Sequence, residues 1–159
     1  MNFGSNISAD LAGDSFNTYD VWLERLVRSR ANVNAVEALG NQHFAYCEQG
    51  SQSVLLVSFE NIQRLRRESP EGVPRGLSLA QHWGWSSLAL LSTDDTWFRD
   101  KSVYSYFDDL ATSDYFENFD RVVFYGAGPS SAYAAAAFSV AAPGAIVIAI
   151  SPQATLDTA

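Results

Sequence analysis

The chain has little of several residue types on which particular functions depend. Its 159 residues include one cysteine, Cys47, and two histidines, so no internal disulfide can form and no zinc-site spacing exists. Lys and Arg number 10 against 18 Asp and Glu, for a net charge of -8. Because nucleic-acid binding draws most of its affinity from basic side chains, we expect no nucleic-acid partner. We also expect no metal and no other cofactor.

Long apolar runs are scarce as well. The most apolar segment, 132–150, is interrupted by Pro143-Gly144, and neither piece reaches the roughly 20 residues of a membrane-spanning helix. The first residues lack the basic stretch and apolar core of a secretory signal. We therefore expect a cytoplasmic protein without a membrane partner.

The residues that are present suit a folded domain. Hydrophobic residues make up 47% of the chain and charged residues 18%, a balance that can bury a core. Residues 1–18 are rich in Asn, Ser, Gly and Asp without an apolar period, which predicts a flexible lead-in before a single α/β domain at 19–159. With Asp20 as its N-cap, the apolar spacing of Leu23 and Leu26 predicts an amphipathic helix.

Apolar runs of strand length recur through the rest of the chain. The runs 43–48 and 53–59 lie at hairpin spacing around Gln49–Gln52, and 87–92 predicts another buried strand. Aromatic residues between 97 and 119 follow a helical spacing. The last part predicts a strand at 121–125, a turn at 126–129, a helix at 131–142 and a strand at 145–150. Strand, turn, helix and strand in this order form the repeating unit of a parallel sheet.

The last quarter of the chain is almost without charge. After Arg121 the only charged residue is Asp157, so little of this part is suited to face water. The predicted strand 145–150 has no later element to cover its far side. We expect that earlier elements wrap over it, that a partner covers it, for example by self-association through the uncovered edge, or that the sheet continues in a longer protein, which we favour.

Two chemical patterns overlap at the turn after strand 121–125. In the first, Gly128-Pro129-Ser130-Ser131-Ala132 is a G-x-S-x-G elbow that ends in alanine, with Ser130 as the nucleophile and the Ser131 N–H as an oxyanion donor. In the second, Gly126-Ala127-Gly128 opens a dinucleotide fingerprint with Ser131 at the third glycine position. That fingerprint expects an acid after the next strand, where the sequence has Ser151-Pro152.

The order of the predicted elements resembles the N-terminal half of the α/β-hydrolase fold. Over residues 43–157 the chain is similar to hydrolase-like proteins of bacterial polysaccharide loci, whose elbow has the form Y-G-x-S-M-G-G-Y-A-A. The likeness rests on Trp97-Phe98-Arg99-Asp100, Phe124-Tyr125-Gly126, Tyr133-Ala134-Ala135, Phe138-Ser139 and Pro152-Gln153. It implies a three-layer, mostly parallel sheet, incomplete here at its C-terminus.

The resemblance also implies a catalytic apparatus. It places a serine nucleophile at the elbow, an oxyanion N–H after the third strand, near Phe59 and Glu60, and an acid and a histidine later in the chain. Counted forward from Tyr125, however, the serine of the family falls on Gly128, and only the G-x-S-x-A spacing selects Ser130. No histidine follows Ser130, since both His43 and His82 precede it.

The sequence therefore leaves two main hypotheses and a weaker third. The first is a serine-hydrolase-like domain of the esterase or acyl-transfer class, acting on a small-molecule, glycan or acyl substrate, and truncated or inactive as given. The second is a non-catalytic binding or assembly module of the same fold. The third is a dinucleotide-binding unit. Whether Ser130 or Gly128 occupies the nucleophile position stays open.

Overall fold

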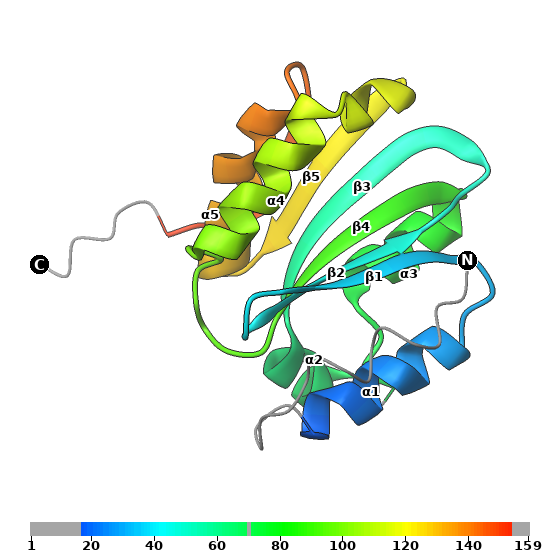
Figure 1. Ribbon diagram of the computed structural model, residues 1–159, viewed down its shortest axis with the longest axis vertical. Coiled ribbons are helices and arrows are strands. Elements are labelled where there is room, and N and C mark those ends of the chain that lie inside the picture. The colour runs from blue at the N-terminus through cyan, green and yellow to red at the C-terminus, as the bar shows by residue number, and fades with distance from the viewer. Residues whose placement is uncertain (1–16, 70, 154–159) are drawn as a thin grey trace, which may run out of the picture. The chain divides into compact units, whose positions relative to one another are not determined.

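The computed structural model describes residues 17–69 and 71–153 (Figure 1). The chain divides into two compact units, Met1–Ala31 and Asn32–Ala159. The first unit contains helix α1, Asn17–Arg28. This helix begins three residues before Asp20, which therefore lies in its first turn, where an acid favours the helix dipole, and not at the N-cap. Residues 1–16 of the predicted lead-in lie outside the described residues.

The second unit is built on a six-stranded sheet with the order β1-β2-β4-β3-β5-β6. The strand pairs β1–β2 and β2–β4 are antiparallel, and the pairs β4–β3, β3–β5 and β5–β6 are parallel. The α/β class is thus confirmed, with a mixed and mostly parallel sheet. The strands are β1 Val33–Leu39, β2 His43–Glu48, β3 Gln52–Asn61, β4 Trp85–Ser92, β5 Arg121–Ala127 and β6 Ile146–Ile150.

The hairpin predicted between residues 43–48 and 53–59 is wrong. Strand β2 pairs with β1 on one side and with β4 on the other, and β3 lies beyond β4. The β4 strand pairs with β2 along its whole length, from His43 opposite Ser92 to Glu48 opposite Ser87, so it occupies the side of β2 on which a hairpin partner would lie. Strand β4 is equally apolar and takes the place between β2 and β3. Strand β1 was not predicted, because Asn34 and Glu37 interrupt its apolar pattern.

Helices cover both faces of the central strand β3. Its residues Leu55 and Val57 belong to a core on the side of α4 and α5, whereas Leu56 packs with Ala80 of α3 on the other side. Figure 1 shows α4 and α5 lying together beside β5, with α3 across the sheet. The α-helices among the described residues of this unit are α2 Ile62–Glu68, α3 Arg75–Trp83, α4 Lys101–Thr112 and α5 Pro129–Phe138.

An aromatic cluster fills the core between the sheet and α4 and α5. The ring of Phe59 is fully buried and stacks with Phe107, Phe124 and Phe138 at centroid distances of 5.9, 6.4 and 5.6 Å. Phe98 meets the same ring edge-on at 5.2 Å. The helical spacing predicted at 97–119 corresponds to α4 and a following 3-10 turn at Tyr115–Asn118.

The predicted strand–turn–helix–strand unit at the end of the chain is confirmed as β5, α5 and β6. Strand β6 pairs with β5, and within the described part of the chain it has no neighbour on its other side. All five residues of β6 are exposed, among them Ile148 at 44%. Self-association through this edge stays a prediction, which sedimentation velocity of the protein and its Ile148→Lys variant would test.

Candidate functional site

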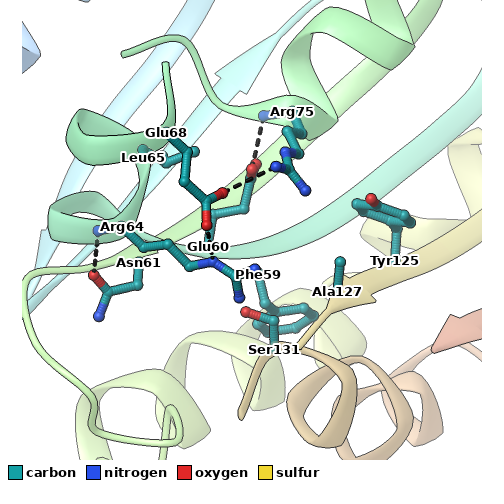
Figure 2. Close-up of a pocket in the computed structure, with 10 residues that line it drawn as sticks. All are labelled: Phe59, Glu60, Asn61, Arg64, Leu65, Glu68, Arg75, Tyr125, Ala127 and Ser131. Carbon is teal, nitrogen blue, oxygen red and sulfur yellow. Dashed lines mark hydrogen bonds and ion pairs between the residues drawn. The ribbon is translucent and has the colours of Figure 1, made fainter. Parts of the chain in front are cut away.

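A small pocket lies where the carboxyl ends of β3 and β5 meet the starts of α2, α3 and α5 (Figure 2). Open parallel sheets bind ligands at this edge. The cavity measures about 30 Å³. It brings together three of the four residues that the sequence selected, Phe59, Glu60 and Ser131, and Ser130 is not among its lining residues. The others that line it are Asn61, Arg64, Leu65, Glu68, Arg75, Tyr125 and Ala127.

Gly128 occupies the junction between β5 and α5. Its backbone has φ 96° and ψ 166°, a region that L side chains rarely adopt, and its N–H donates to the Ile150 carbonyl at 2.9 Å. A Cβ atom at Gly128 would lie 2.5 Å from Nη1 of Arg64. Ser130 is the second residue of α5 and is partly exposed. The turn that an elbow nucleophile would occupy therefore carries glycine, with an arginine guanidinium above it.

Gly126 allows α5 to start close to β5. A Cβ atom at this position would lie 2.7 Å from the Ala132 nitrogen and still closer to the Ser131 carbonyl. Both the elbow pattern and the dinucleotide fingerprint use a glycine where a helix lies this close to a strand. The close approach of α5 to Gly126 therefore fits both hypotheses equally well. Strand β6 ends at Ile150, and Ser151 and Pro152 follow it.

The first turn of α5 leaves backbone donors outside the helical hydrogen-bond ladder. The first bond of this helix runs from the Ala132 N–H to the Gly128 carbonyl at 2.9 Å, and Pro129 has no N–H. The N–H groups of Ser130 and Ser131 therefore precede the helical ladder, as at any helix N-terminus. Ser131 is 7% exposed, and its hydroxyl has no hydrogen-bond partner among residues 17–69 and 71–153.

Phe59 and Glu60 lie within strand β3, which continues to Asn61. They are opposite Leu90 and Leu91 of β4. The sequence assigned an oxyanion N–H to a loop at Phe59 and Glu60, whereas the structure has sheet backbone there. An oxyanion role for these two residues remains a prediction.

The Glu60 side chain caps helix α3. Its carboxylate accepts the N–H of Arg75 at 2.7 Å and the N–H of Gly76 at 3.1 Å, while the side chain of Pro74, at the N-cap, has no acceptor atom and makes no cap hydrogen bond. Burial raises the pKa of Glu60 above its usual value, and the two N–H donors and the Arg75 charge oppose that shift. The Glu60 carboxylate is therefore occupied by the first N–H groups of α3. Glu60 lies 15 residues before Arg75 in the sequence, so no local motif predicts this contact.

Two arginines share one glutamate at the mouth of the pocket. Glu68 accepts from Nε of Arg64 at 2.7 Å and from Nη2 of Arg75 at 2.9 Å (Figure 2). The hydrogen bond from Arg64 is the main cause that lowers the pKa of Glu68. These side chains are 38–54% exposed, so the pairs contribute little to stability. Arg64, Arg66 and Arg67 stand close together in the sequence, but nothing in that local pattern indicates that Arg64 reaches the turn at Gly128.

The other candidate side chains lie outside the pocket. His43 is buried, its Nε2 lies 2.6 Å from Oγ1 of Thr96, and burial lowers its pKa. His82 meets the Trp83 ring edge-on at 4.9 Å. Burial raises the pKa of the Cys47 thiol to about 11, which makes it a poor nucleophile. Within the described ranges, no group of three or more His, Cys, Asp or Glu side chains is placed to hold a metal ion.

A wider cavity of about 650 Å³ lies at the opposite end of the strands, next to the amino ends of β5 and β6. It is lined by residues 116–117, 119–122 and 142–146. These amino ends of the strands face away from the N-terminus of α5. Ligand sites of parallel sheets lie at the carboxyl ends of the strands instead. We therefore take the smaller pocket as the candidate site.

Comparison with family models, curated proteins and solved structures gave no match to this chain. No helix in the described residues has the length and apolar character to cross a membrane.

The buried position of Glu60 predicts a specific pH dependence of stability. Because its pKa in the folded state lies above the ordinary 4.5, ionising it costs more in the folded chain than in the unfolded one. The contribution of Glu60 to stability should therefore fall as pH rises from about 4.5 through the raised pKa, and stay low above it. Glu60→Gln has no such titration.

The measurement is the free energy of unfolding in urea at several pH values between about 4.5 and neutrality. We expect the advantage of the wild-type protein over Glu60→Gln to shrink as pH rises. Glu71→Gln, an exposed change of the same charge, is the control. A wild-type advantage that grows with pH would contradict the assignment.

Proposed function

We propose that this chain is a domain of α/β-hydrolase type that binds a small ligand at the pocket and has no serine nucleophile. One observation carries the proposal: Gly128, and not Ser130, stands at the turn between β5 and α5. The guanidinium of Arg64 lies above that glycine, in the space that the side chain of a nucleophile would need.

The order of the elements supports the α/β-hydrolase type. An antiparallel pair, β1 and β2, stands at one side of the sheet, and the parallel unit β5–α5–β6 ends the described chain at the other. The strand, helix and strand that the resemblance requires around the elbow are all present. Helices lie on both faces of β3, which is the layering of such a fold.

The surroundings of Ser130 favour binding over hydrolysis. A serine nucleophile needs a base within hydrogen-bond reach, usually a histidine held by a third group. The chain has no histidine after Ser130, and Nε2 of His43 is already engaged by Thr96. Acyl or glycan groups remain candidate ligands, because the first turn of α5 offers N–H donors to a carbonyl or hydroxyl oxygen.

The competing hypothesis, an esterase that uses Ser130, makes a different prediction for p-nitrophenyl acetate. We expect the protein to hydrolyse this ester no faster than Ser130→Ala does, because neither has an activated serine. Ser139→Ala, a serine change outside the pocket, is the matched control. A rate that falls about 100-fold or more in Ser130→Ala alone, as for loss of an activated nucleophile, would overturn the proposal.

Dinucleotide binding is the third possibility and has the least support. Gly126 and Gly128 are placed as that fingerprint requires, but the residues after β6 are Ser151 and Pro152 in place of an acid. Titration with NADH, followed by its fluorescence, separates the two kinds of ligand. We expect no saturable change, and a saturable one would favour the dinucleotide.

A further inference from the structure

We propose that the ligand of this pocket carries a carboxylate group, which the Arg64 guanidinium and the first turn of α5 hold together. This inference rests on the proposed function, since it takes the pocket as the ligand site. It adds the chemical class of the ligand and the residues that select it.

The terminal nitrogens of the Arg64 guanidinium are available as hydrogen-bond donors at the pocket. Glu68 takes its Nε–H at 2.7 Å, and the two terminal nitrogens have no hydrogen-bond partner in the described part of the chain. Nη1 is the atom closest to the Cβ position of Gly128, so it faces the start of α5. A planar guanidinium with free terminal nitrogens matches the two oxygens of a carboxylate.

Ser131 supplies a second polar group at the pocket. The residue is 93% buried, as its exposed fraction is 7%, it lines the cavity, and its hydroxyl has no hydrogen-bond partner among the described residues. The oxygen is not one of the fully buried polar atoms of the described residues, so it is open to the cavity and available to a ligand. Figure 2 shows the Ser131 side chain and the guanidinium of Arg64 converging on the same space. A ligand oxygen placed there satisfies both.

Helix α5 adds backbone donors on the same side. The N–H groups of Ser130 and Ser131 lie ahead of the first helical bond, and the positive end of the helix dipole favours an anion at this point. The ten residues of α5 make that dipole substantial. The Arg64 guanidinium and the Ser131 hydroxyl therefore lie at one pocket, and the N–H groups at the start of α5 are next to it in the chain.

The charges around the cavity favour an anionic ligand group. Arg64 and Arg75 face a single shared carboxylate, Glu68, and the Glu60 carboxylate is turned to the N–H groups of α3. The cavity is small, and the planar fork of the Arg64 guanidinium matches the planar carboxylate group.

The test is a titration of the full ¹⁵N-labelled chain with sodium acetate, followed by NMR, with sodium chloride as the salt control. We expect saturable shifts at the amides of Ser130 and Ser131 and at Nε of Arg64. Arg64→Gln should weaken acetate binding about 10-fold or more, since it removes charge-assisted hydrogen bonds. Ser131→Ala should weaken it about 3-fold or more.

Arg66→Gln is the matched control, because Arg66 is an exposed residue of the same helix that does not line the pocket. It removes the same charge and should leave the affinity for acetate unchanged. Equal losses in Arg64→Gln and Arg66→Gln would overturn the proposal, as would shifts that sodium chloride reproduces. Tighter saturable binding of inorganic phosphate than of acetate would overturn the choice of a carboxylate.

Failure of this inference differs from failure of the proposed function. If the protein does not bind acetate and Ser130→Ala leaves the esterase rate unchanged, the proposal of a carboxylate ligand is wrong. The proposal of a non-hydrolytic ligand-binding pocket then stands. If esterase activity requires Ser130, the proposed function is wrong whatever acetate does.

Discussion

Replacing Gly126 by alanine is expected to lower the free energy of unfolding by at least about 3 kcal/mol, the upper end of the usual cost of overpacking. A Cβ atom there would meet the Ser131 carbonyl and lie 2.7 Å from the Ala132 nitrogen. These are backbone atoms of α5, so no side-chain rotation can relieve the clash. Helix α5 would have to move away from β5, and the pocket would lose its geometry with it.

Gly144→Ala is the control for this prediction. Gly144 has a positive φ of 84° but no atom within 4 Å of its Cβ position, so alanine there adds only backbone strain of about 1–2 kcal/mol. Urea denaturation followed by circular dichroism measures both variants. A loss at Gly126 no larger than the loss at Gly144 would contradict the close packing of α5 on β5.

Truncation of Phe59 to alanine is expected to cost about 3–5 kcal/mol of stability, as for other large buried aromatic residues. The ring has no exposed surface, and it stacks against Phe107 of α4 and Phe138 of α5. Its loss would leave a cavity under both helices, which cannot close without moving them from the sheet. Since Phe59 also lines the pocket, ligand binding should weaken as well.

Trp83→Ala serves as the comparison, because it removes a larger aromatic ring from a side chain that is 59% exposed. We expect it to cost less than about 1 kcal/mol, in the range of surface substitutions and a single aromatic pair. The same denaturation experiment applies. Comparable losses for the two variants would show that Phe59 does not hold the core together.

The sequence predicted the elements whose pattern is local. Short connections join β5, its glycine turn, α5 and β6. The residue composition of each of these segments favours a single type of secondary structure. The pairing of β2 could not be predicted in this way. Its hairpin spacing toward residue 53 is real, but β4, more than 30 residues further on, competes for the same edge and pairs there.

The candidate site shows the same division. Motif counting selected Ser130 by one spacing and Gly128 by another, because Gly128, Ser130 and Ser131 are all small enough for a tight turn. Only the backbone conformation separates them, and the positive φ falls on Gly128. Arg64 and Glu60 escaped prediction for a different reason. Their partners, the turn at Gly128 and the start of α3, are distant in sequence.

The most direct test of the central claim, that Gly128 has taken the place of the nucleophile, is a reaction of the native protein with a fluorophosphonate, followed by intact mass and peptide mapping. A known serine esterase in the same reaction is the positive control. We predict no adduct on Ser130 and the same spectrum for Ser130→Ala. An adduct on Ser130 that disappears in Ser130→Ala would contradict the claim and restore the hydrolase hypothesis.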